Sequence, residues 1–76
     1  MSPDAVEALA HLRARRGGWT ARGVALSLGW DRRPLTLYSA RVVDTFRAER
    51  ALAPLVAAGL VAVRTSAEGT RYRAVA

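Results

Sequence analysis

Arginine is the residue type in this sequence that could do chemistry, and that chemistry is the binding of anions. The chain has twelve arginines and no lysine against six acidic residues, which leaves a formal net charge of +6 over 76 residues. A guanidinium group is permanently charged and presents a planar fork of donors that matches phosphate oxygens. So large an excess favours polyanionic partners, with nucleic acid first and an anionic membrane surface second.

Residues suited to catalysis or to metal binding do not gather in the sequence. The chain has no cysteine and a single histidine, His11, so neither a thiolate site nor a histidine cluster can form. His11 stands beside Leu12 on the first predicted helix, where we expect a surface or boundary position. The acidic residues are scattered and no glycine-rich loop follows a predicted strand, so we expect no enzyme activity, no cofactor and no bound metal.

The length of the chain suits a single small domain, which we expect to span residues 1–76. The N-terminus has no basic region followed by an apolar one, and no apolar run approaches the roughly 20 residues that cross a bilayer. We therefore expect a soluble, cytoplasmic protein without a membrane partner. The lack of cysteine fits a reducing compartment.

Two helices are predicted in the first part of the chain. The first runs over residues 3–16, with Ser2 as its N-cap and apolar residues such as Val6 at three- and four-residue spacing. The attraction of cations to a helix C-terminus explains the arginines at its end without a ligand. These residues are Arg13, Arg15 and Arg16. The second helix begins after Thr20 as its N-cap and ends at Gly29.

A turn and a third helix are predicted next. Residues Trp30 to Pro34 form the turn, because a residue before proline avoids helical geometry. The third helix runs from residue 36 or 39 to residue 58, but its apolar stripe shifts by roughly a quarter to a third of a turn along its length. A continuous straight helix would place Glu49 within that stripe. We therefore expect a break near Arg47 to Arg50 or a kink at Pro54.

After Gly59 the period of the apolar pattern changes from that of a helix to that of a strand. Val61 and Val63 alternate with smaller or charged residues, and an alternating pattern resumes over residues 70–75. Between the two runs, Ser66-Ala67-Glu68-Gly69 predicts a four-residue loop with glycine at the position that needs a positive φ. The chain is therefore predicted to end in a β-hairpin.

Three helices followed by a hairpin resemble the winged helix-turn-helix superfamily. The segments that carry the resemblance are VALSLG at residues 24–29 and LAPLVAAGLV at residues 52–61. The resemblance implies an α+β fold, a three-helix winged helix-turn-helix with a C-terminal β-hairpin wing, in which the third helix enters the major groove. Gly29 and Gly59 stand farther apart than in that family, so the extra residues lengthen either the turn between the helices or the third helix itself.

The resemblance assigns base contacts to the outer face of the third helix, where the sequence has Arg41, Arg47 and Arg50. Because the chain has neither Asn nor Gln, direct base contacts would depend on arginine to guanine and on apolar contacts to thymine methyls. The alternative is a solvated face, in which Arg47 and Arg50 merely pair with Asp44 or Glu49.

Further arginines are predicted to contact the DNA backbone. As a wing, the hairpin would grip phosphates or enter a minor groove through Arg64, Arg71 and Arg73. Simple alternation of polar and apolar residues would also place these side chains outside the core. Other candidate phosphate contacts lie at the start of the second helix and in the turn after it. They are Thr20, Arg22, Arg32 and Arg33.

These features predict a small, sequence-recognising protein that binds double-stranded DNA as a transcriptional or replication-type regulator. The alternative is a winged-helix interaction module that binds an acidic protein partner, such as a polymerase or another regulator. The segment Trp30 to Tyr38, which a helix-turn-helix core does not need, motivates this alternative and would also serve as a homodimer contact. Trp19 and Trp30 are expected to pack at the edge of the core rather than to stack on bases.

Overall fold

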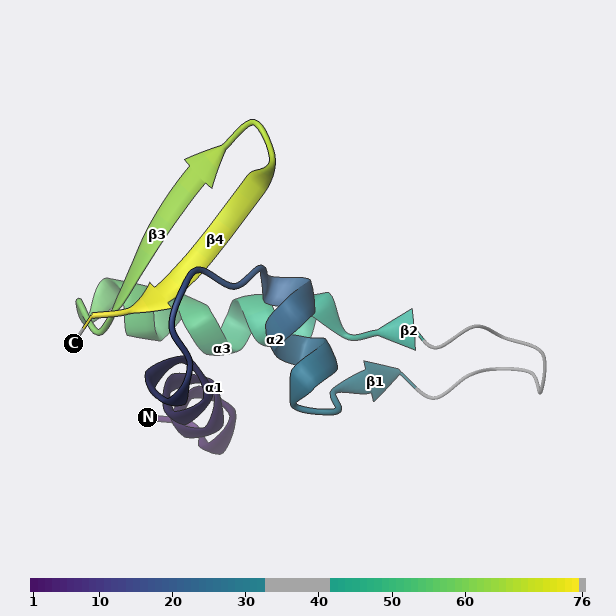
Figure 1. The fold of residues 1–76 in the computed structure, drawn as a ribbon. Coiled ribbons are helices and arrows are strands. Elements are labelled where there is room, and N and C mark those ends of the chain that lie inside the picture. Colours follow the sequence, from purple (N-terminus) through teal and green to yellow (C-terminus); the bar gives the residue numbers. More distant parts are fainter. Residues whose placement is uncertain (33–41, 76) are drawn as a thin grey trace.

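The computed structural model describes residues 1–32 and 42–75 of the chain, and Figure 1 shows their arrangement. Three helices pack together, and a hairpin projects from them. In chain order the elements are α1 (Pro3–Ala14), α2 (Ala21–Ser27), β1 (Asp31–Arg32), β2 (Val42–Val43), α3 (Thr45–Ala57), β3 (Val61–Ser66) and β4 (Gly69–Ala74). The expected α+β class, with three helices and a C-terminal antiparallel hairpin, is confirmed.

Each helix begins at a side chain that accepts a hydrogen bond from its first turn. The Ser2 hydroxyl accepts from the amide of Ala5 at 3.1 Å, and the Thr20 hydroxyl accepts from the amide of Gly23 at 3.0 Å. Both N-caps agree with the sequence prediction. The first helix ends two residues early, at Ala14, because Arg15 adopts an extended backbone as its C-cap.

The core is built from small and aliphatic side chains on facing helices. Leu52 and Leu55 of α3 are fully buried, and Val24 of α2 packs with them. Alanines on α1 and α3, among them Ala8 and Ala48, are also fully buried and let these helices approach closely. Val6 was predicted to point inward, but its side chain is 53% exposed, because α1 turns its alanine-rich stripe to the core instead.

The third helix differs from its prediction at its beginning. It starts at Thr45, where the Asp44 carboxylate accepts from the amide of Arg47 at 3.0 Å, and it runs without interruption to Ala57. Val42 and Val43, which the predicted helix included, belong to strand β2, so the break expected near Arg47 to Arg50 is wrong. Pro54, the site of the alternative kink, lies inside the uninterrupted helix. Glu49 accordingly lies on the exposed side of the helix.

The predicted turn after α2 is wrong in its described part. Trp30 is buried and its carbonyl accepts from the amide of Asp44 at 2.7 Å, while Asp31–Arg32 pair antiparallel with Val42–Val43. Residues 33–41, which include Pro34, lie outside the described residues. The extra length between Gly29 and Gly59 therefore lies before α3 and not within it.

The paired strands of the C-terminal hairpin extend farther toward its tip than predicted, and the loop that joins them is shorter. Ser66 pairs with Gly69, so the loop is two residues long and not four, with Gly69 at φ +120°. The connector from α1 to α2 pairs with the edge of β4 that does not face β3. Trp19 and Tyr72 exchange two backbone hydrogen bonds, at 2.9 and 2.7 Å. This bridge holds the connector beside β4.

Candidate nucleic-acid interface

The hairpin separates apolar from basic side chains by the alternation of its two strands. Val61 pairs with Ala74, and Val63 with Tyr72, so these residues share one face of the hairpin. Val61, Tyr72 and Ala74 pack against the core on this face, while Val63, nearer the tip, is 43% exposed. The intervening residues share the opposite, solvent-facing side. They include Arg64, Arg71 and Arg73, all of them exposed. The structure therefore brings these predicted site residues together on one face.

Arg64 and Arg71 lie directly opposite each other in the antiparallel register. Side chains at such positions have Cβ atoms roughly 5 Å apart, and like charges there repel. Arg71 donates from Nη1 to the carbonyl of Gly18 at 3.3 Å. Within the described part of the chain, no carboxylate forms an ion pair with either residue. Arg64 and Arg71 therefore present two like charges to solvent.

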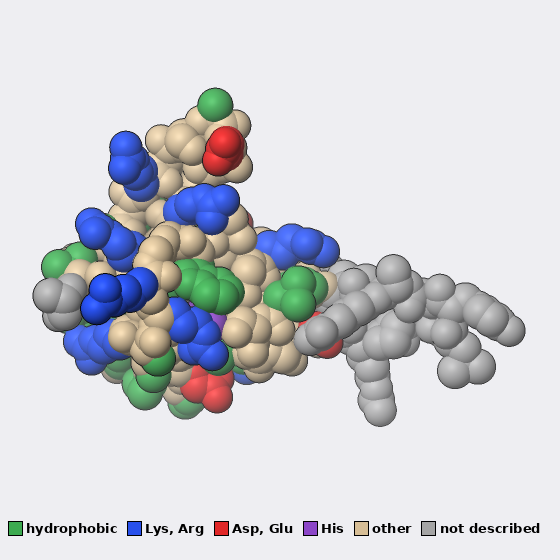
Figure 2. All heavy atoms as spheres, viewed as in Figure 1, with side chains coloured by type: hydrophobic (Ala, Val, Ile, Leu, Met, Phe, Trp, Pro, Cys, Tyr) green, Lys and Arg blue, Asp and Glu red, His purple; other side chains and the backbone are tan. Residues whose placement is uncertain are grey.

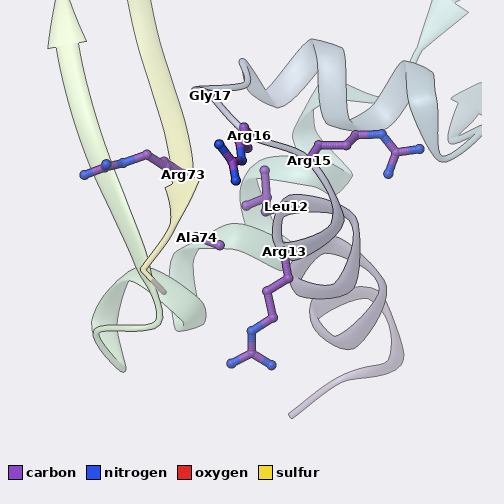
Figure 3. A pocket seen from close by; sticks show the side chains of 7 residues that line it. All are labelled: Leu12, Arg13, Arg15, Arg16, Gly17, Arg73 and Ala74. Atoms are coloured by element: carbon purple, nitrogen blue, oxygen red, sulfur yellow. The ribbon is translucent and has the colours of Figure 1, made fainter.

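A second group of arginines continues the basic surface from β4 to the end of α1. Arg73 and Ala74 line one side of a surface hollow, and the C-terminal residues of α1 with the following connector line the other (Figure 3). The residues on that other side are Leu12, Arg13, Arg15, Arg16 and Gly17. An adjoining hollow on the hairpin is lined by Gly18, Ala62, Val63, Arg64, Arg71 and Arg73. Arg73 belongs to both hollows and joins them.

We call this joined surface the arginine face, and we define it by Arg13, Arg15, Arg16, Arg64, Arg71 and Arg73. Figure 2 shows arginine side chains spread along the hairpin and over the adjoining helical part of the molecule. In Figure 3 the guanidinium groups of Arg13, Arg15 and Arg73 point in different directions. A fan of separated charges suits several phosphates of a polymer better than a single small anion.

Arg13, Arg15 and Arg16 were not predicted as site residues, because the helix dipole accounted for them. Arg15 does donate to the carbonyl of His11, at 3.5 Å, as expected near a helix C-terminus. The bridge between Trp19 and Tyr72 is what brings this stretch beside Arg73. The glycine pair after the first helix was the signal in the sequence for a close approach of the chain. The connector approaches β4 at Gly18, where a Cβ would lie 3.0 Å from the Cβ of Arg71.

Arg47 was predicted to contact bases, but it is engaged within the fold. Its Nε and Nη2 donate to the two carboxylate oxygens of Asp4, each at 2.8 Å, and its guanidinium lies 4.5 Å from the centroid of the Trp30 ring. The hydrogen bonds from Arg47 lower the pKa of Asp4 and raise the pKa of Arg47. The guanidinium of Arg47 thus forms its ion pair with Asp4, and with neither Asp44 nor Glu49, because tertiary packing brings α1 to this end of α3.

The other predicted site residues are distributed as follows. Arg50 is exposed on α3, and its guanidinium lies 5.1 Å from the centroid of the Phe46 ring. Arg22 is exposed on α2, while the hydroxyl oxygen of Thr20 serves as the N-cap of that helix. Arg32 belongs to β1 through its backbone. Arg33 and Arg41 lie outside the described residues.

His11 was expected near the surface, but its side chain is only 4% exposed. Its ring meets the Trp19 ring edge-on, with centroids 4.6 Å apart, and its Nε2 has no hydrogen-bond partner in the described structure. Burial, and to a smaller extent the charge of Arg15, lower the pKa of His11. Trp30 is also buried, at 4% exposed, so it offers no side chain for the partner surface expected over Trp30 to Tyr38.

The part of the chain that the structure describes offers neither a metal cluster nor a membrane-spanning helix. No three His, Cys, Asp or Glu side chains there are close enough to hold a metal ion. No helix among those residues has the length and apolar character to cross a membrane. Comparison with protein-family models, curated proteins and solved structures finds no match to this chain.

Proposed function

We propose that this protein binds double-stranded DNA through the arginine face. The observation that carries the proposal is that arginines from the end of α1 and from both hairpin strands line two hollows that share Arg73. No carboxylate lines either of its two hollows. Phosphate contacts of this kind supply most of the affinity of proteins for nucleic acid without regard to sequence.

A duplex fits this surface better than a single strand. Proteins that bind single strands combine basic residues with aromatic side chains on which the bases stack. The aromatic residues nearest the arginine face, Trp19 and Tyr72, are half-buried and pack against the core. The arginine face thus presents charge without a stacking platform, as contacts to the sugar-phosphate backbone of a duplex require.

The geometry supports the hairpin, rather than the outer side of α3, as the main point of contact. On α3 the predicted base contact Arg47 is paired with Asp4, and the guanidinium of the exposed Arg50 lies over the Phe46 ring. The direct passage of α3 into the hairpin supports a winged helix-turn-helix arrangement. In that arrangement the hairpin is the wing, and the protein would act on transcription or replication by occupying DNA.

Fluorescence anisotropy with a labelled random-sequence duplex tests the proposal. If about six phosphates are neutralised, log affinity falls with log salt at a slope of about −5 between roughly 50 and 200 mM salt. Arg73→Ala removes the charge of a residue that lines both hollows and should reduce the magnitude of the slope by about one. The matched control is Arg50→Ala, which removes the same charge from α3 and should leave the slope unchanged.

Two outcomes would overturn the proposal. Absence of binding at both salt concentrations excludes DNA as the polyanion. A loss of affinity in Arg50→Ala with none in Arg73→Ala moves the contact from the arginine face to α3. Circular dichroism of both variants controls for folding, and both side chains are exposed, so we expect both variants to fold.

A further inference from the structure

The outer side of α3 presents a surface that the proposed DNA contact does not use. Its residues lie on one arc of the helix, opposite the buried Leu52 and Leu55. We call it the α3 face and define it by Phe46, Glu49, Arg50, Ala53, Pro54 and Ala57, all exposed. Phe46 is 59% exposed, an unusual position for a large aromatic side chain. The side chain of Glu49 has no hydrogen bond or ion pair with any described residue.

The α3 face is complementary to itself when two helices run antiparallel. When Phe46 of one copy lies opposite Ala53 of the other, the two-fold axis passes between Glu49 and Arg50. The same axis opposes Glu49 of each copy to Arg50 of the other. One two-fold axis therefore satisfies the aromatic contact and both charge pairs at once, as an isologous interface requires. The small side chain of Ala53 lets the helices approach and leaves room for the Phe46 ring of the other copy.

We propose that a second copy of this chain binds the α3 face, forming an antiparallel two-fold dimer through α3. A thirteen-residue helix is about 20 Å long, so the contact is smaller than standard stable interfaces. The dimer should therefore form in the micromolar range. Assembly leaves both arginine faces free, because the arginine face is composed of residues from α1, the connector and the hairpin.

Sedimentation velocity with the full chain tests this interface. Between about 5 and 200 µM, which brackets a micromolar affinity, the wild type should pass from monomer to dimer. Glu49→Arg and Arg50→Glu each place like charges across the axis and should each stay monomeric. An equimolar mixture of the two variants restores opposite charges and should sediment as a dimer. Phe46→Ala should weaken association about tenfold or more.

The matched control is Arg64→Ala/Arg73→Ala, which changes two exposed arginines of the hairpin and should dimerise like the wild type. A wild-type monomer throughout this range, or a mixture of charge variants that stays monomeric, overturns the proposal. So does a dimer that Glu49→Arg leaves intact. Because anisotropy at submicromolar protein reports on the monomer, failure of the dimer and failure of DNA binding are observed separately.

Discussion

Guanidinium groups in this chain are either paired within the fold, as in Arg47, or exposed without an ion-pair partner among the described residues, as in Arg73. Arg47 makes two hydrogen bonds to Asp4 and stacks on Trp30, so its charge is neutralised within the fold. Arg73 is exposed between two hollows, and no carboxylate of the described residues pairs with it. At this scale, the availability of a charge depends on its neighbours and not on its residue type.

His11 leads to a prediction for the dependence of stability on pH. Its pKa in the folded protein lies below the ordinary value of 6.5, mainly because burial disfavours the imidazolium form. The unfolded chain therefore binds a proton more readily, and stability should be constant above about pH 6.5 and fall as the pH drops toward the folded pKa. The variant His11→Phe should remove this decline.

His11→Phe keeps a ring against Trp19 and removes the unpaired buried Nε2, so it should also stabilise the fold at pH 7 by on the order of 1 kcal/mol. Urea unfolding of wild type and variant at pH 5, 6, 7 and 8 gives both quantities. A wild-type profile that is flat between pH 7 and 5 would contradict the assignment of a neutral, buried imidazole.

At the scale of elements, the hairpin combines a folding task with the proposed binding task. Its inner face supplies Val61 and Tyr72 to the core, and its outer face opposes Arg64 to Arg71. A strand pair selected for stability alone would place opposite charges at those positions. The like-charge pair therefore lowers the stability of the hairpin, and an anionic ligand would offset this loss.

The pairing of Arg64 with Arg71 predicts opposite effects of Arg64→Glu on the stability of the fold and on DNA binding. A glutamate opposite Arg71 replaces a repulsion by an attraction, so the free energy of unfolding should rise by roughly half a kcal/mol. DNA affinity should fall, because a phosphate contact is replaced by a repulsive charge. Chemical denaturation and anisotropy measure the two effects. A variant that is destabilised and binds DNA normally would contradict both parts of the argument.

At the scale of the whole molecule, acidic and basic groups are unevenly distributed. The hairpin and the end of α1 carry the arginine face, while Asp4 and Asp44 lie at the N-terminal end of α3. The pair formed by Asp4 and Arg47 joins segments 43 residues apart in the chain and fixes α1 against α3. Removing it should loosen the contact between the two helices on which the hairpin stands.

The ion pair predicts how the molecule responds to acid. Because the pKa of Asp4 is lower in the folded protein than its ordinary value of 3.8, the stability that the carboxylate contributes is present above about pH 4. It should be lost as the pH falls through the lowered folded pKa. Asp4→Asn should reduce stability at pH 7 and flatten the acid side of the profile. Thermal unfolding from pH 7 to pH 2 measures this, and equal acid slopes for both proteins would contradict it.

The sequence by itself determined the elements that depend on local patterns. Ser2 and Thr20 mark helix starts because a side-chain oxygen at an N-cap satisfies an amide of the first turn. The alternation after Gly59 likewise determined the hairpin and the shared face of Arg64, Arg71 and Arg73. Local chemistry sufficed here because each feature depends on residues only a few positions apart, or on a single hairpin.

Only the tertiary structure decided where α3 begins and which arginines are free. Val43 could extend a helical stripe or form a strand, and its pairing with Asp31 decides for the strand. Arg47 is engaged by Asp4, and the end of α1 lies near Arg73 because α1 and the connector after it pack against β4. Such contacts join residues far apart in the chain, so neither periodicity nor spacing contains them.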